Sequence, residues 1–308
     1  MTTLLFTHDD CIEHDAGFSH PERPDRLRAV VAVLEAEAFA ALQRRQAPRA
    51  EREQIERVHD PAYVSHILGS VPASGHYSLD PDTALSPGSG EAGLRAAGAL
   101  CAAVDAVLGG EARNAFCAVR PPGHHAEAAR AMGFCLFNNV AIGARHAHAA
   151  HGLERVAVVD FDVHHGNGTQ SAFERDGDFL FASSHQSPCY PGTGSEAETG
   201  VGNIVNAELP PGSGSEAFRH AFGERILPAL DGFAPKMILI SAGFDAHASD
   251  PLAQLNLTED DFAWATREIL AIAGKHCEER IVSTLEGGYD LDALGASVAA
   301  HVAVLMDG

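Results

Sequence analysis

The stretch Arg155-Val156-Ala157-Val158-Val159-Asp160-Phe161-Asp162-Val163-His164-His165-Gly166-Asn167-Gly168-Thr169 decides the fold that the sequence predicts. Its first half is an apolar run of Val and Ala, typical of a strand buried on both faces of a parallel sheet. In an extended backbone, Asp160, Asp162 and His164 project to one side. Ligands of open α/β sheets bind at the carboxyl ends of the strands. The stretch therefore predicts half of a metal site, because a helix cap would need only one such residue.

The rest of the chain alternates between strand-like and helix-like segments. Further strands are expected at residues 3–7, 115–120, 179–184, 237–241 and 280–285. Helices are expected at about residues 24–39, 50–59, 61–68, 91–108, 138–149, 170–173, 216–227 and 259–273, and at the C-terminus. A long polar connection covers residues 69–90. This alternation predicts an α/β protein with a single open, mostly parallel β-sheet and helices on both faces, formed by one domain over residues 1–308.

Composition narrows the function classes. The chain has 308 residues, of which 45% are hydrophobic, and its net charge is -21, from 21 Lys and Arg against 42 Asp and Glu. Such an acidic chain is not expected to bind nucleic acid or an anionic membrane surface. The six cysteines show no CxxC spacing, and neither an export signal nor a long apolar run is present, so a reduced, cytoplasmic protein is expected.

Four predicted strands end in reactive side chains. The strand ending near residue 120 leads to His124 and His125, and the last strand leads to Tyr289. A parallel sheet brings such ends to one edge, where Asp245 would join the acidic stretch quoted above.

The converging residues suit metal-assisted hydrolysis of an amide. Asp162, His164 and Asp245 would form a three-ligand set with an open position, as catalytic zinc sites require. The two histidines can transfer protons, and Tyr289 can donate a hydrogen bond to an oxyanion.

The motifs that carry these residues resemble the histone deacetylase family, which includes acetylpolyamine amidohydrolases and acetoin-utilisation proteins. The resemblance extends from residue 20 to residue 289, and its motifs are Arg120-Pro121-Pro122-Gly123-His124-His125, Gly133-Phe134-Cys135, Asp160-Phe161-Asp162-Val163-His164-His165-Gly166-Asn167-Gly168, Tyr190-Pro191-Gly192-Thr193-Gly194, Ala242-Gly243-Phe244-Asp245 and Glu286-Gly287-Gly288-Tyr289. It implies the arginase/deacetylase fold and a zinc-dependent deacetylase mechanism.

The resemblance also implies a role for each matching residue. Asp162, His164 and Asp245 match the metal ligands, and the catalytic positions are His124, His125, Tyr289, Asp160 and Asn167. In this scheme Asp160 orients His124. Asn167 orients His125, the general base, and Asn at this position resembles the class II subgroup of the family. The substrate-binding positions are Phe134, Tyr190, Gly133, Asp82 and Leu252, and Arg23 matches an internal-channel arginine.

The cofactors and partners follow from the same resemblance. One Zn²⁺ per chain is expected, with Fe²⁺ as the alternative. A structural K⁺ is expected at Asp160, Asp162, His164, Ser183 and Ser184. The partner is a small acylated substrate such as an acyl-lysine or an acylated amine, and the sequence leaves the oligomeric state open.

Other interpretations remain open at the level of sequence. A binuclear ureohydrolase would need Asp where this chain has Gly166. An inactive acyl-binding module would tolerate the loss of a metal ligand or of Tyr289, but here none of them is missing. An acetylpolyamine amidohydrolase is the nearer alternative, but the gatekeeper glutamate of some relatives is Leu252 here.

Five further side chains that could carry chemistry lie outside these motifs. His146, His148 and His151 do not share one helix face and are expected to be solvated. His247 is expected at the pocket rim, and Cys189 beside the pocket as a small buried residue.

Overall fold

The computed structural model describes residues 2–307 and contains an eight-stranded sheet and a two-stranded hairpin. The large sheet consists of β1 (Thr3–Thr7), β2 (Gln43–Gln46), β5 (Asn114–Cys117), β6 (Val156–Asp160), β7 (Phe179–Gln186), β8 (Ile204–Leu209), β9 (Met237–Ala242) and β10 (Ile281–Leu285). Its strand order is β2-β1-β5-β10-β9-β6-β7-β8, and every paired neighbour runs parallel. All strand carboxyl ends therefore meet at one edge.

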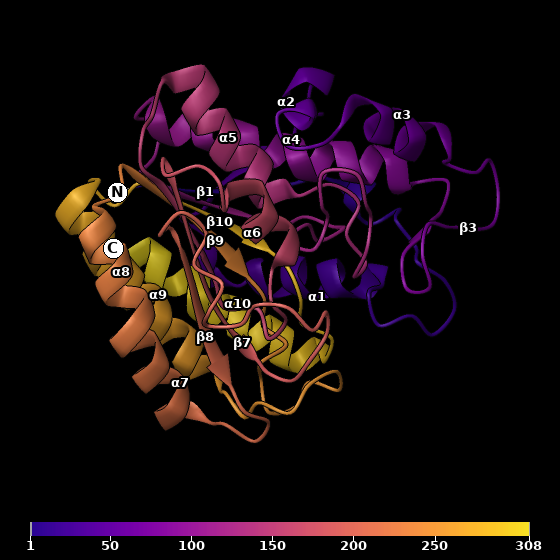
Figure 1. Cartoon of the computed structure of the whole chain (residues 1–308). Helices are drawn as coiled ribbons and strands as arrows, with labels where there is room; N and C mark the ends of the chain where they lie inside the picture. The colour runs from indigo at the N-terminus through magenta and orange to yellow at the C-terminus, as the bar shows by residue number, and fades with distance from the viewer. Residues whose placement is uncertain (1, 308) are drawn as a thin grey trace.

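Helices cover both faces of this sheet (Figure 1). One layer contains α2 (Arg52–Glu56), α3 (Pro61–Gly69), α4 (Ser89–Leu108), α5 (Asn139–His151) and α6 (Asn167–Phe173). The other contains α1 (Pro24–Leu34), α7 (Ser215–Ala221), α8 (Leu227–Phe233), α9 (Glu259–His276) and α10 (Leu291–Asp307). The predicted α/β class and the parallel sheet with two helical layers are confirmed.

The central strands are apolar because both faces are covered. All residues of β6, β9 and β10 are buried, which explains why these segments are nearly continuous runs of Val, Ile and Leu. Helix α4 is rich in Ala and Gly, so it packs closely against α5 and β5. Helices α4 and α5 both run from the edge formed by the strand carboxyl ends, called the site edge below, toward the opposite edge.

Several elements differ from the sequence prediction. Strands β2 and β8 were not predicted, and the connection at residues 69–90 contains the hairpin of β3 (Tyr77–Ser78) and β4 (Ala84–Leu85). The helix expected at 216–227 is interrupted by a π-helical segment, η3 (Phe222–Ile226), between α7 and α8. Short 3-10 turns lie at η1 (Asp9–Cys11) and η2 (Glu37–Phe39).

A fully buried ionic network fastens the N-terminal segment to the site edge of the sheet. Arg120, three residues after the end of β5, forms two hydrogen bonds with the Glu22 carboxylate, one of them 2.6 Å long. Arg26 donates to Glu22 Oε1 (3.2 Å) and to the carbonyl oxygens of Glu286 (2.5 Å) and Gly288 (2.6 Å). Burial alone would raise the pKa of Glu22, but Arg120 and His14 hold this pKa well below its usual value.

We expect Glu22→Gln to lower the free energy of unfolding by about 3 kcal/mol or more, because it leaves two buried guanidinium groups without their carboxylate. Since the pKa of Glu22 is depressed, the same stabilisation is present above about pH 4.5 and is lost as the pH falls below it. Urea denaturation at neutral and acidic pH measures both effects.

Glu35→Gln is the matched control, because Glu35 pairs with Arg44 at 3.3 Å on the exposed surface. This change is expected to cost less than about 1 kcal/mol. Equal losses in the two variants would contradict the role given to the buried network.

Candidate active site and metal centre

Three metal-ligand side chains converge at the carboxyl edge of the sheet. His164 Nδ1 lies 3.1 Å from Asp162 Oδ1 and 3.1 Å from Asp245 Oδ2. One ligand atom from each residue lies within 4.8 Å of the other two, and all three residues are buried. Two carboxylates and an imidazole in this arrangement fit a divalent cation such as Zn²⁺, with room for a further ligand on the pocket side.

The local backbone differs from the extended one assumed from the sequence. Strand β6 ends at Asp160, and the next residues form a turn in which the His164 backbone N–H donates to Asp162 Oδ1 (2.9 Å). The Asp162 backbone N–H donates to Asp160 Oδ1 (3.1 Å). The turn therefore aims Asp162 and His164 toward Asp245, while Asp160 faces His124 instead.

The backbone packs closely around the metal-ligand carboxylates. Gly287 donates its N–H to Asp162 Oδ2 (2.8 Å), and Val163 donates to Asp245 Oδ1 (2.9 Å). A Cβ atom at position 287 would lie 2.1 Å from Asp245 Oδ2, so only glycine fits there. The motif glycine after Glu286 thus allows a backbone donor to reach the buried acids.

Burial and mutual repulsion raise the pKa of Asp245 to about 7, with Asp162 as the main repelling charge. Although burial opposes it, the carboxylates of Asp162 and Asp245 raise the pKa of His164 well above its usual value. In the absence of a cation the cluster therefore holds protons that a metal ion would displace.

The two consecutive histidines lie in opposite electrostatic environments. His124 Nδ1 is 2.9 Å from Asp160 Oδ2, and although burial opposes it, Asp162 and Asp160 raise the pKa of His124 to about 10. His125 Nδ1 is 2.8 Å from Asn167 Oδ1. Burial, followed by the charges of His124 and His164, lowers the pKa of His125 well below its usual value.

A glutamate that the sequence analysis missed lies behind Asn167. The Asn167 side-chain N–H₂ donates to Glu127 Oε1 (2.8 Å), so its carbonyl oxygen must face the His125 ring. Because Asn167 Oδ1 can only accept, His125 Nδ1 carries the proton and Nε2 keeps a free lone pair. The only signal in the sequence was the position of Glu127, two residues after the histidine pair.

The predicted substrate residues line one pocket of about 210 Å³. Its walls are Asp82, Pro122, His124, His125, Gly133, Phe134, His164, Tyr190, Leu252, Gly287 and Tyr289. The Phe134 ring meets the Tyr289 ring edge-on at 5.9 Å, and the Tyr190 ring lies 5.1 Å from the His125 ring. The pocket is thus a narrow aromatic passage that ends at the histidines and the metal ligands.

A positive φ of 67° at Phe134 holds this wall in an unusual conformation. The Phe134 N–H donates to Thr83 Oγ1 (3.0 Å), and the Gly133 N–H donates to Asp82 Oδ1 (3.1 Å). Both acceptors lie between the two strands of the hairpin in the residue 69–90 connection, so this hairpin supports the pocket wall. The Asp82 carboxylate also accepts from the Thr83 hydroxyl (2.8 Å).

Tyr289 is supported from below by an arginine other than the one expected. Arg26 places its guanidinium carbon 4.8 Å from the centre of the Tyr289 ring, while Arg23 is exposed and lies 3.6 Å from Asp25. The internal position expected for Arg23 is therefore wrong, because α1 turns its third residue, Arg26, inward. Burial raises the pKa of Tyr289 well above its usual value, so the phenol keeps its proton.

The remaining predicted residues lie around this centre. Ser183 Oγ contacts His185 Nδ1 (2.9 Å), and Ser184 Oγ is buried without a hydrogen-bond partner among residues 2–307. His247 lies 3.6 Å from Glu259 and does not line the pocket, contrary to the expected rim position. Cys189 is a free thiol that is only half-buried.

The chain matches the family model described as "Histone deacetylase domain" over residues 20–305. It is 43% identical to the histone deacetylase-like amidohydrolase of Pseudomonas aeruginosa over 284 residues, which cover 90% of this chain and 74% of that protein. The chain therefore belongs to the histone deacetylase family. Among solved structures it is similar to the protein described as "Crystal Structure of HDA15 HD domain", with a TM-score of 0.94, 34% identity and coverage of 99% of this chain and 88% of the other. The expected arginase/deacetylase fold is thereby confirmed.

Another histone deacetylase relative bears on the substrate question. The human "Polyamine deacetylase HDAC10" is 37% identical over 328 residues, which cover 99% of this chain and 48% of that protein. Family membership makes this chain a hydrolase of the deacetylase or amidohydrolase type. Within residues 2–307, no helix has the length and apolar character needed to cross a bilayer.

The ureohydrolase alternative has no structural support at Gly166. A Cβ atom there would lie 2.5 Å from Asp160 Oδ2 and 3.2 Å from His124 Nδ1. A carboxylate for a second metal ion therefore has no space at the position where a ureohydrolase needs one.

We expect the Zn²⁺ affinity of this deacetylase-family site to fall about tenfold or more between about pH 8 and about pH 6. The reason is that His164 and Asp245, whose pKa values are raised, must lose protons to bind the ion. Competition with a chelator at each pH measures the affinity.

Asp245→Asn should bind Zn²⁺ more weakly and with a shallower pH dependence, because it removes one of the competing protons. An affinity that is constant over this pH range would show that other groups bind the ion.

Proposed function

We propose that this protein is a zinc-dependent deacetylase that hydrolyses the N-acyl amide of acetyl-lysine or of a related acylated amine. The observation that carries the proposal is the convergence of Asp162, His164 and Asp245 at the base of a pocket that also holds His125 and Tyr289. Family membership supports the reaction class, and these residues supply what the reaction needs. Zn²⁺ is the favoured ion, with Fe²⁺ as the alternative, and the K⁺ expected near Ser183 and Ser184 stays a prediction.

The ion and the histidines would divide the chemistry. Asp162, His164 and Asp245 would hold Zn²⁺, which would act as a Lewis acid and lower the pKa of a water molecule. His125, neutral and with a free Nε2, accepts the proton of the attacking water, because its lowered pKa keeps it unprotonated at neutral pH. The carboxylate of Asp160, 2.9 Å from His124 Nδ1, favours the protonated form of His124, which would stabilise developing negative charge.

Tyr289 would stabilise the oxyanion of the tetrahedral intermediate. It lines the pocket beside Phe134, and its phenol keeps its proton because burial raises its pKa. Arg26 below the ring and Asp250, whose carboxylate accepts from the Tyr289 backbone N–H (2.7 Å), would fix its position. A hydrogen-bond donor held in place before the reaction is more effective than one that must first reorient.

The pocket walls favour a neutral, unbranched acyl-amine chain. Phe134 and Tyr190 present aromatic surfaces to the aliphatic part of the substrate, and half-buried Leu252 adds an apolar contact. An acetylpolyamine would keep at least one free, positively charged ammonium group, whose charge Leu252 cannot compensate. Acetyl-lysine is therefore the first choice, and an acetylpolyamine, the substrate class named for the human relative, is the second.

We expect the purified protein to deacetylate a fluorogenic acetyl-lysine substrate, and Tyr289→Phe to lower kcat by about 10²–10³ through loss of one oxyanion donor. Tyr190→Phe is the matched control, because it removes a hydroxyl at the half-exposed pocket mouth and should change kcat far less. His125→Ala and Asp245→Asn should abolish activity.

A wild type that is inert with Zn²⁺ and with Fe²⁺, on several acyl groups, would overturn the proposal in favour of an acyl-binding module. Binding of the uncleaved acetyl-lysine peptide by this inert protein would then identify the module directly.

We expect Leu252→Glu to raise the ratio of kcat/KM for acetylputrescine to kcat/KM for an acetyl-lysine peptide about tenfold, equivalent to about 1.4 kcal/mol. The new carboxylate would attract the free ammonium group of the polyamine. Leu252→Gln introduces a side chain of nearly the same shape as glutamate but without its charge, and it should leave the ratio almost unchanged. An equal change in both variants would show that shape, and not charge, sets the preference.

A further inference from the structure

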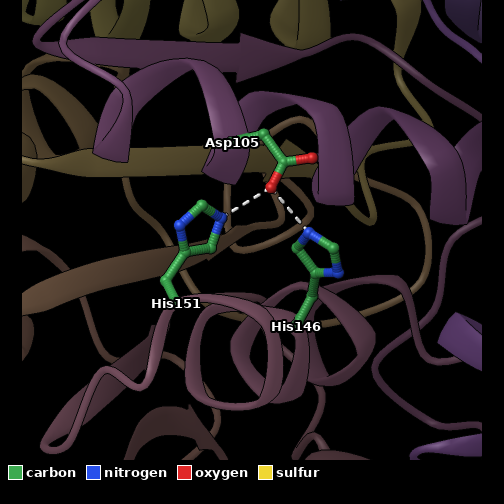
Figure 2. Close-up of side chains that lie close together, drawn as sticks. All are labelled: Asp105, His146 and His151. Carbon is green, nitrogen blue, oxygen red and sulfur yellow. Dashed lines mark hydrogen bonds and ion pairs between the residues drawn. The ribbon is translucent and has the colours of Figure 1, made fainter.

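A second group of metal-ligand side chains lies outside the pocket, between α4 and α5. Asp105 comes from α4, and His146 and His151 come from the last two turns of α5 (Figure 2). His146 Nε2 and His151 Nε2 each lie 2.7 Å from the same carboxylate oxygen, Asp105 Oδ1. One ligand atom from each residue lies within 4.8 Å of the other two.

This arrangement corrects the expectation of three solvated histidines. His146 is buried, and it converges with His151 although five positions separate them, because the two rings approach Asp105 from either side (Figure 2). His148 turns away, with Nδ1 3.2 Å from the Leu153 carbonyl oxygen and its ring 5.6 Å from that of Phe179.

The cluster is remote from the proposed active site. Helix α5 follows Asn138 at the site edge of the sheet and ends at His151, shortly before β6 begins at Val156. Since β6 then runs back to Asp160, His151 lies at the amino-terminal edge of the strands. The cluster and the active site are thus at opposite ends of the helical layer.

We propose that Asp105, His146 and His151 bind a divalent transition-metal cation of the Zn²⁺ class. Two imidazoles and a carboxylate are a ligand set that zinc favours, and here both imidazole Nε2 atoms already face the same Asp105 oxygen. The Asp105 side chain is 51% accessible and that of His151 31%, so solvent can complete the coordination. A bound cation would join the end of α5 to α4 and stabilise this seam.

Arg57 limits the affinity of this site. Its Nη1 lies 2.7 Å from His146 Nδ1, and because a guanidinium can only donate, His146 keeps its proton on Nε2, toward Asp105. Metal binding requires that Nε2 lone pair, so the proton must leave and Arg57 must move. Glu53, 3.5 Å from Arg57 Nη2 and mostly exposed, offers an alternative partner for the guanidinium.

The test is to count bound Zn²⁺ by calorimetry in the wild type and in four variants, with thermal unfolding of each. The expected result is one ion fewer in His151→Ala and in Asp105→Asn than in the wild type. His148→Ala, a change to the neighbouring histidine outside the cluster, should keep the wild-type count. Arg57→Gln should raise the affinity for the more weakly bound Zn²⁺ about tenfold, because it removes a positive charge and frees His146 Nδ1.

Thermal unfolding gives a second readout. Zn²⁺ beyond the first equivalent should raise Tm by a few degrees in the wild type and in His148→Ala, but not in His151→Ala or Asp105→Asn. Because the readout is a difference of one ion between variants, it does not depend on what the active site holds.

Two outcomes would overturn the proposal. One is a wild type that binds no more Zn²⁺ than His151→Ala and Asp105→Asn at millimolar concentrations. The other is extra Zn²⁺ that persists in every variant, which would indicate scattered binding to the acidic surface.

Discussion

The buried carboxylate of Asp162 is the constraint on which the site edge depends. A charge in an apolar interior is costly unless donors or an ion compensate it. Asp162 accepts from the backbone of His164 and of Gly287, and His164 Nδ1 lies beside it. Although burial opposes it, His124 and His164 lower its pKa, so Asp162 is the member of the cluster that stays ionised.

This constraint explains why glycine and histidine crowd the strand ends. Gly243 and Gly287 leave room for the Asp162 carboxylate, where a Cβ at position 243 would lie 2.0 Å from Asp162 Oδ2. Glu286 is buried as well, and its carboxylate accepts from the Gly123 (2.7 Å) and His124 (3.2 Å) backbone N–H groups. Buried acids at the strand ends therefore have two effects on the histidine pair. Glu286 fixes the loop that carries both histidines, and Asp162, which is also a candidate metal ligand, raises the pKa of His124 together with Asp160 although burial opposes it.

How much of this could be read from the sequence depended on the range of the interactions. The buried strands, and the convergence of Asp162, His164 and Asp245, follow from apolar runs and from the parallel arrangement of their ends. Strand β2 escaped prediction because its residues Gln43–Gln46 contain no apolar side chain, and its pairing with β1 alone defines it.

The contacts that the sequence could not supply are those between distant side chains. Arg26 and not Arg23 faces Tyr289, because the position of the first turn of α1 decides which arginine points inward. Asp105 meets His146 and His151 only because α4 packs against α5, and no local pattern marks Asp105. Glu127 reaches Asn167 across a turn that depends on the completed fold.

The two outer strands of the sheet make it a poor template for another chain. At one side, all four residues of β2 are exposed, and two of them are arginines. At the other side, the π-helical segment packs against β8, where Arg225 donates to the Asn206 carbonyl oxygen (3.0 Å). Charge at one edge and a covering helix at the other discourage further strand pairing, so the sheet ends at eight strands. For the same reason, copies of this acidic protein resist edge-to-edge aggregation.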